Sequence, residues 1–209
     1  MQEINPQLFE KEIQQIEAML KSQAHSENCI AFFGSSTFRM WSTMAEDLNP
    51  YPVLNLGFGG SSFPYAIYYF DRLFKDFRPK AIMFYFGDND LGRGDSPNAI
   101  RKNFLRLCEL IMDKWQKMPP FSIISVKPSV EKAHMLDKIA QTNALLQHEA
   151  RALNGKWVNI YEKMLNENGG ANSALYLADG LHLNETGYKI WQKNIREHLF
   201  DEYQWVLKQ

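Results

Sequence analysis

Short apolar segments recur along the chain, and most are followed by a stretch in which apolar residues have helical spacing. The segments 29–33, 53–56, 81–86, 121–126 and 157–160 are predicted as β-strands. Residues 81–86 (AIMFYF) are apolar throughout, which is typical of a strand buried on both faces of a sheet. Residues 157–160 (WVNI) give the weakest of these signals.

Helical periodicity is clearest in the second half of the chain. Ser96-Pro97 is a typical helix start, and the apolar residues at 100, 104, 107, 111 and 115 then fall three or four apart. Another apolar stripe runs from Leu136 to Leu153 and ends at Asn154-Gly155, a typical stop signal. A further helix is expected after residue 184, and an N-terminal helix over roughly residues 6–21.

The alternation of strands and helices, without hairpin signals, predicts parallel strands joined by helical crossovers. The expected fold is a three-layer α/β/α sandwich around about five parallel strands. No repeat or interdomain linker is evident, so residues 1–209 are predicted to form one domain, with a helix in residues 1–24 packed on it. Ligands of such folds bind beyond the carboxyl ends of the strands.

Composition narrows the class of protein. Apolar residues make up 45% of the 209 residues, charged residues 22%, and the net charge is -1, as in an ordinary globular protein. No basic block is present, so nucleic acid is not an expected partner. Cys29 and Cys108 lie within apolar segments and are predicted to be buried small residues rather than a disulfide or metal ligands. Metal-ligand spacing is absent, and no metal site is predicted.

The N-terminal residues include early acidic side chains and no apolar core of a signal peptide. No segment approaches the ~18 apolar residues that a membrane helix needs. We therefore expect a cytoplasmic protein without a membrane span. The sequence leaves the oligomeric state open.

Residues that could take part in catalysis follow several of the predicted strands. The first strand leads into Gly34-Ser35-Ser36, where a hydroxyl lies near a helix N-terminus that favours a developing oxyanion. The second leads into glycine-rich residues 57–60, and the third into Asn89, whose side chain is a hydrogen-bond donor. Asp179 precedes His182 by three residues, a spacing that lets a carboxylate accept from Nδ1 and leaves Nε2 to take a serine proton.

Each of these features alone is weak, but their combination is specific. FFGSSTFRMW, NLGFGGS, FGDND and DGLHLNETGY resemble, in order, the four signature blocks of the SGNH hydrolases, the GDSL-like lipases and acylhydrolases. The resemblance covers about residues 29–200. It implies a flavodoxin-like sheet and no metal or organic cofactor. It also implies Ser36 as nucleophile, Asp179 and His182 as its acid–base pair, and an oxyanion hole formed by Ser36, Gly60 and Asn89.

One position departs from the family pattern. Ser35 stands where the first block usually has aspartate, so either serine is a formal candidate for the nucleophile, and the family spacing favours Ser36. Phe58 and Lys127 are weaker candidates for substrate contacts. Arg39 is expected either to line the site or to have a structural role, and Asp90 to orient its loop.

The sequence therefore predicts a serine esterase that hydrolyses small carboxylic esters, with short-chain or acetyl esters favoured by the resemblance. An acyltransferase with the same triad is an alternative. A nucleotide- or flavin-binding protein and a non-catalytic ligand-binding relative are further alternatives. The glycine-rich segment GFGGSS partly matches the nucleotide-binding motif Gly-x-Gly-x-x-Gly, but Ser62 stands where the motif requires its third glycine. The remaining histidines, His198 among them, are expected at the surface or on helix faces.

Overall fold

The computed structural model describes residues 4–22 and 28–207. Its sheet has five strands in the order β2-β1-β3-β4-β5, and every neighbouring pair is parallel. The strands are β1 (Ile30–Gly34), β2 (Val53–Asn55), β3 (Ala81–Tyr85), β4 (Phe121–Ile124) and β5 (Lys156–Val158). The predicted parallel α/β fold is confirmed.

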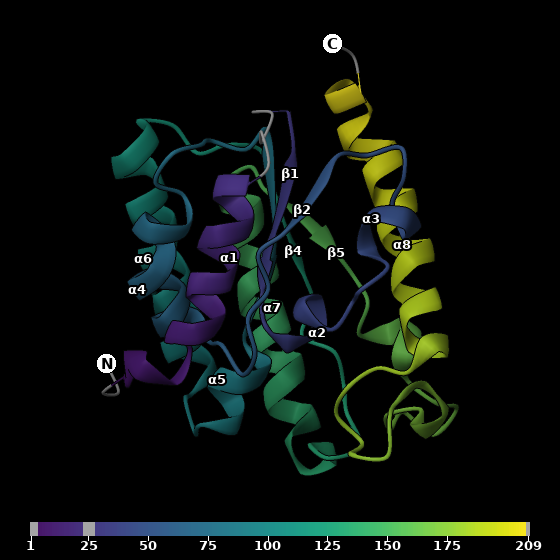
Figure 1. Ribbon diagram of the computed structural model, residues 1–209. Helices are drawn as coiled ribbons and strands as arrows, with labels where there is room; N and C mark the ends of the chain where they lie inside the picture. Colours follow the sequence, from purple (N-terminus) through teal and green to yellow (C-terminus); the bar gives the residue numbers. More distant parts are fainter. Residues whose placement is uncertain (1–3, 23–27, 208–209) are drawn as a thin grey trace.

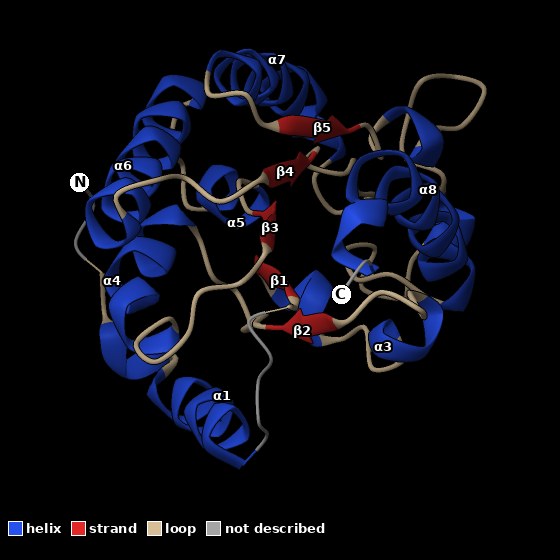
Figure 2. Cartoon of the chain, turned by 90° about the horizontal axis from the view of Figure 1, so that it is seen from above, coloured by secondary structure: helices blue, strands red, loops and turns tan. Residues whose placement is uncertain are grey.

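Helices cover both faces of this sheet and produce three layers (Figures 1 and 2). One face carries α1 (Glu10–Ser22), α4 (Phe63–Leu73), α6 (Pro97–Trp115) and α7 (Leu136–Ala152). The other carries α3 (Met44–Asp47) and α8 (Glu185–Tyr203). The short helices α2 (Ser36–Arg39) and α5 (Asp88–Gly92) follow β1 and β3. Single 3-10 turns span Pro6–Leu8, Ala133–Met135, Glu162–Met164, Ser173–Leu175 and Gln204–Leu207.

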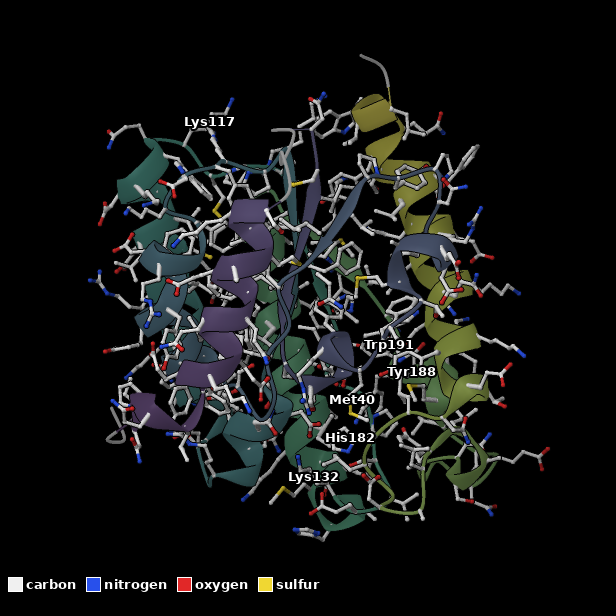
Figure 3. The ribbon with its side chains drawn as sticks, viewed as in Figure 1. Met40, Lys117, Lys132, His182, Tyr188 and Trp191 are labelled. Carbon is white, nitrogen blue, oxygen red and sulfur yellow. The ribbon has the colours of Figure 1, made fainter. Side chains whose placement is uncertain are left out.

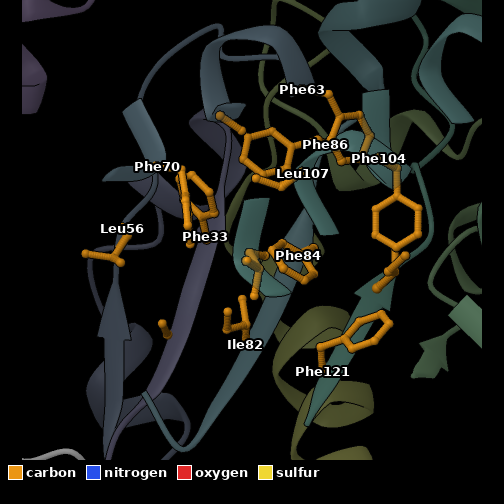
Figure 4. Packing of buried hydrophobic residues seen from close by; sticks show 14 of the residues in the cluster. Phe33, Leu56, Phe63, Phe70, Ile82, Phe84, Phe86, Phe104, Leu107 and Phe121 are labelled. Carbon is orange, nitrogen blue, oxygen red and sulfur yellow. The ribbon is translucent and has the colours of Figure 1, made fainter. Parts of the chain in front are cut away.

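Each face of the sheet has its own apolar core. Alternate residues of a strand point to opposite faces, so Phe33 belongs to one core and Phe32 to the other. The core beneath α1, α4, α6 and α7 is rich in phenylalanine (Figure 4). Phe33, for example, packs edge-on against Phe86 with ring centroids 5.2 Å apart. Cys29 and Cys108 are buried in this same core as free thiols, as predicted.

The predicted helix boundaries are confirmed by their caps. The Ser96 hydroxyl accepts from the Ala99 N–H at 3.2 Å, at the start of α6. The Asn184 side chain accepts from the Gly187 N–H at 3.0 Å, at the start of α8. After α7, Asn154 has a φ of 59°, the left-handed conformation expected of a stop signal.

Two strands, β4 and β5, end two residues earlier than the apolar pattern predicts. β4 stops at Ile124, because the side-chain amide of Asn143 bonds both the N–H and the C=O of Val126. β5 stops at Val158, and the next buried N–H, that of Ile160, donates to the Ser125 hydroxyl at 2.9 Å. Side chains thus provide hydrogen-bond partners for the backbone N–H and C=O groups that lie beyond the last pairing between strands.

His198 lies on the face of α8 that packs on the sheet. Its Nε2 atom is 2.7 Å from the Ser122 hydroxyl, which also bonds the hydroxyl of Tyr203 at 2.8 Å. Burial lowers the pKa of His198 to about 4. His198 thus lies on a helix face, as expected, and is half-buried. None of the helices within the described ranges has the length and apolar character that crossing a membrane requires.

Candidate active site

Ser36 is the first residue of α2 and directly follows the end of β1. The turn between them is tight, because a Cβ atom on Gly34 would lie 2.6 Å from the Phe38 ring and 2.8 Å from the Tyr85 carbonyl oxygen. Glycine is therefore required where the strand meets the helix. The turn leaves Ser36 half-buried, whereas Ser35 is only 3% exposed. Of the two serines, Ser36 is the accessible one.

His182 and Asp179 lie in the loop that precedes α8. The Nδ1 atom of His182 is 2.7 Å from Oδ2 of Asp179. The other carboxylate oxygen, Oδ1, accepts from the N–H groups of Leu181 and His182, both at 2.9 Å. The hydrogen bond from His182, with the two backbone donors, lowers the pKa of Asp179 to about 2. The carboxylate thus fixes both the loop and the imidazole.

The imidazole joins this loop to the helix that follows β1. The Nε2 atom of His182 lies 3.1 Å from Oγ of Ser36, so the three side chains form one hydrogen-bonded chain. The Tyr188 hydroxyl, on α8, donates to the Thr37 carbonyl oxygen at 2.9 Å and holds α8 against α2. Figure 3 shows His182 at the end of the sheet where α2 and α5 lie.

Gly60 lies in the loop after β2, and Asn89 lies in the first turn of α5, which follows β3. The Nδ2 atom of Asn89 donates to the Ser61 carbonyl oxygen at 2.9 Å. The Ser61 hydroxyl donates to the Gly34 carbonyl oxygen at 3.2 Å, so Ser61 connects α5 and the glycine-rich loop to the end of β1. Within residues 4–22 and 28–207, the N–H groups of Ser36 and Gly60 have no acceptor. These two groups are therefore free to bind a ligand.

Asp90, also in α5, joins the starts of α4 and α5 from within the protein. Its side chain is fully buried, and its two oxygens accept from the N–H of Phe63 at 3.0 Å and of Gly87 at 3.1 Å. Burial raises the pKa of Asp90 to about 7. The prediction that Asp90 orients its loop is confirmed by these contacts.

A buried charge cluster lies behind Asn89. Asp88 pairs with Lys132 at 2.6 Å and with Lys127 at 3.5 Å. Burial alone would raise the pKa of Asp88, but the charges of Lys127 and Lys132 outweigh it and the pKa lies below its ordinary value. Burial lowers the pKa of Lys127, against the opposing effect of Asp88. Sequence reasoning missed this cluster, because nothing in the spacing of residues 88 and 132 indicates that they pair.

The structure places both candidate substrate contacts away from solvent. Phe58 is 0% exposed and packs against Phe9 and Tyr69 in the core. Lys127 is 1% exposed, with its ammonium group 5.6 Å from the centre of the Tyr176 ring. Neither side chain reaches the surface near Ser36. Phe58 is close to Gly60 in sequence, but its side chain, like that of Lys127, is buried in the protein.

The profile of the GDSL-like Lipase/Acylhydrolase family matches residues 9–190. No curated protein sequence matches the chain. Among solved structures, a GDSL-like lipase from Bacteroides thetaiotaomicron is 21% identical with a TM-score of 0.76, over 90% of this chain and 97% of that one. A Bacteroides fragilis protein proposed to be an acylhydrolase is 20% identical with a TM-score of 0.76, over 92% and 96%. A lipase/acylhydrolase from Enterococcus faecalis is 19% identical with a TM-score of 0.63, over 81% and 94%.

At such identities the solved structures establish the fold alone, a parallel α/β/α sandwich of the kind found in these hydrolases. The profile match covers most of the chain and establishes the family. The chain belongs to the GDSL-like Lipase/Acylhydrolase family, and this membership supports a hydrolase.

Proposed function

We propose that the protein is a serine esterase in which Ser36 is the nucleophile, His182 the general base and Asp179 the residue that orients the base. The observation that carries the proposal is the hydrogen-bonded chain from Ser36 Oγ through His182 to Asp179, at 3.1 and 2.7 Å. A weak hydroxyl nucleophile becomes effective when a base accepts its proton and a third group orients that base. The three side chains have this arrangement.

In the acylation step, Ser36 Oγ forms a bond to the ester carbonyl carbon while its proton passes to His182 Nε2. The charged imidazolium is stabilised by the carboxylate of Asp179, whose pKa of about 2 keeps it ionised at neutral pH. Collapse of the tetrahedral intermediate breaks the bond to the alcohol oxygen, which takes the proton from His182. Water then repeats the sequence on the acyl-enzyme and releases the acid.

The tetrahedral intermediate carries its negative charge on the former carbonyl oxygen. We assign its stabilisation to the N–H groups of Ser36 and Gly60 and to the Asn89 side-chain amide. Support comes from the two N–H groups, which have no acceptor in the described parts of the chain, and from the second N–H of the Asn89 amide, which Ser61 leaves free. Preorganised donors of this kind typically contribute about 10²–10³-fold each in rate.

Short-chain or acetyl esters are the proposed substrates. β1 passes into α2 through Ser35 alone, and β3 passes into α5 through Phe86 and Gly87. These connections hold no apolar insertion that would cover a long acyl chain. Ser36 is half-buried, so its hydroxyl is open to small esters from solvent. An acyltransferase would use the same residues, with an alcohol in place of water in the second step.

The test uses the purified protein and a Ser36→Ala variant with p-nitrophenyl acetate and p-nitrophenyl octanoate near pH 8. Wild type is expected to release nitrophenolate with multiple turnovers, faster from the acetate. Ser36→Ala should lose several orders of magnitude in kcat while keeping its circular dichroism spectrum. An inert wild type, or full activity in the variant, would overturn the proposal. Faster consumption of the acetyl donor on addition of an alcohol would favour the transferase.

A further inference from the structure

Glu12, in the first turn of α1, touches two parts of the candidate site. Its Oε2 atom accepts from the N–H of Gly59 at 2.7 Å. The same oxygen lies 3.6 Å from Nε of Arg39. Gly59 precedes Gly60, and Arg39 is the last residue of α2, the helix that begins with Ser36. One carboxylate therefore links the glycine-rich loop to the helix that carries the proposed nucleophile.

The approach of this carboxylate depends on the glycine. A Cβ atom on Gly59 would lie 3.1 Å from a Glu12 oxygen and 3.2 Å from the guanidinium carbon of Arg39. The same N-terminal segment supports the loop through Phe9, whose ring is 3.6 Å from the position of a Cβ on Gly60. Figure 1 shows α1 beginning at the end of the sheet where α2 and α5 lie. The start of α1 therefore packs against the glycine-rich loop.

Successive N–H groups of this loop have different partners. Gly57 donates to the Asn55 side chain at 2.9 Å, and Phe58 donates to the Gly34 carbonyl at 3.1 Å. Gly59 donates to Glu12, and Gly60 is the first N–H of the loop without an acceptor in the described parts of the chain. Gly60 has a φ of 64° and is exposed. Glycine-rich backbone has wide conformational freedom, so the direction of the Gly60 N–H depends on what holds Gly59.

We infer that Glu12 is a positioning residue of the oxyanion hole: by binding the Gly59 N–H it directs the neighbouring Gly60 N–H toward the reacting carbonyl. The inference rests on the proposed function of Ser36. An N–H bound to a carboxylate forms a short, strong hydrogen bond, which the distance of 2.7 Å matches. Donors aimed at a developing oxyanion act in the transition state and not on the bound substrate, so their loss lowers kcat rather than raising KM.

The test compares Glu12→Ala and Glu12→Gln with Glu17→Ala in the p-nitrophenyl acetate assay. Glu17 is a matched control, because it lies on the same helix, is 27% exposed against 29% for Glu12, and pairs with Arg72 on α4 instead of the loop. Glu12→Ala should lower kcat about 10–100-fold with KM within about threefold, since a misplaced catalytic group can cost about 10²-fold. Glu12→Gln keeps an oxygen that accepts from Gly59 and should stay within about threefold of wild type.

The outcomes separate the inference from the proposed function on which it rests. Equal kcat in Glu12→Ala and wild type, or equal losses in Glu12→Ala and Glu17→Ala, would overturn the inference alone. A loss in Glu12→Gln as large as in Glu12→Ala would also overturn it, because the hydrogen bond to Gly59 would not be the cause. An inert wild type, or activity that survives Ser36→Ala, overturns the proposed function and the inference with it. Thermal melting of each variant shows whether a loss comes from unfolding.

Discussion

The side-chain amide of Asn89, in α5, donates to the carbonyl oxygen of Ser61, in the loop after β2, at 2.9 Å. The bond uses one of the two amide hydrogens and fixes the plane of the amide. The other hydrogen remains available to a ligand. Orientation and donation are thus separate tasks of one side chain, and substitutions at residue 89 can distinguish them.

Asn89→Ala should lower kcat about 10²–10³-fold with little change in KM, because a transition-state donor is removed. Asn89→Asp has the same shape and no N–H to donate, so it should lose at least as much. Steady-state kinetics with p-nitrophenyl acetate measures both. If Asn89→Ala stayed within about threefold of wild type, the assigned oxyanion contact would be wrong.

Asp179→Asn should separate the two roles of the Asp179 carboxylate. The asparagine oxygen can still accept from the backbone N–H groups of Leu181 and His182, so the loop should keep its shape. The amide nitrogen would face His182 Nδ1, disfavour the required tautomer and fail to stabilise the imidazolium. A loss of kcat on the order of 10⁴-fold is expected by analogy with other serine triads.

Stability must be measured beside this rate, because Asp179 also holds its loop. Melting temperatures of Asp179→Asn and wild type should agree within a few degrees. Near-wild-type turnover in the folded variant would mean that His182 does not need this carboxylate as its partner.

The buried cluster behind Asn89 predicts a stability effect rather than a binding effect. Asp88→Ala would leave the ammonium groups of Lys127 and Lys132 buried without their partner. Unpairing a buried charge costs about 3–5 kcal/mol, so the free energy of unfolding should fall by roughly that amount. Lys127→Met should cost less, because Asp88 keeps its contact with Lys132 at 2.6 Å. Urea unfolding at pH 7 measures both.

Asp71→Ala is the control for the cluster, because Asp71 is 79% exposed in its pair with Lys114. Exposed pairs contribute about 0–1 kcal/mol, and this variant should unfold like wild type. KM for p-nitrophenyl acetate should not change in Lys127→Met, since the side chain is 1% exposed. A large rise in KM with unchanged stability would restore Lys127 as a substrate contact.

His198 predicts a loss of stability in mild acid. Its pKa of about 4 in the folded protein lies below the ordinary value of 6.5, so the unfolded chain binds a proton more readily. Protonation of His198 does not reduce the free energy of unfolding above pH 6.5. The free energy of unfolding falls as the pH decreases from 6.5 toward 4, because the unfolded chain then binds the proton more readily. The full effect is about 3 kcal/mol at most, since one pKa unit is worth about 1.4 kcal/mol.

Urea unfolding of His198→Gln and wild type between pH 4.5 and 7.5 tests this prediction. The variant should show a weaker decline in acid than wild type. His148→Gln, at an exposed position of α7, should follow the wild-type curve. Identical pH profiles for His198→Gln and wild type would show that the half-buried imidazole of His198 does not cause the effect.

The fold and its caps were predictable because they depend on local signals. Ser96 and Asn184 cap their helices through side chains three residues from their partners, and such spacing is visible in a sequence. The end of β4 was not predictable from the sequence, because the side chain of Asn143, in α7, provides the hydrogen bonds to Val126. Strand ends that depend on tertiary hydrogen bonds require the structure.

The candidate site likewise contains residues that the sequence predicts and residues that only the structure reveals. The block pattern identified Ser36, Asp179 and His182, and the structure brings these side chains within hydrogen-bond distance. Glu12 was not identified, because its partner Gly59 is 47 residues away and an early helical glutamate is ordinary. Phe58 lies between site residues in the sequence, yet its side chain is buried in the core. The local backbone conformation sets the direction of a side chain, and nearness in sequence does not reveal it.

Covalent labelling tests the central claim, that Ser36 is the nucleophile, most directly. The protein would be incubated with a fluorophosphonate, which reacts with activated serines, and the modified peptide sequenced by mass spectrometry. The account predicts one label, on Ser36, which is absent from Ser36→Ala and reduced in a His182→Ala variant. A label on Ser35, or none on a folded wild-type protein, would contradict it.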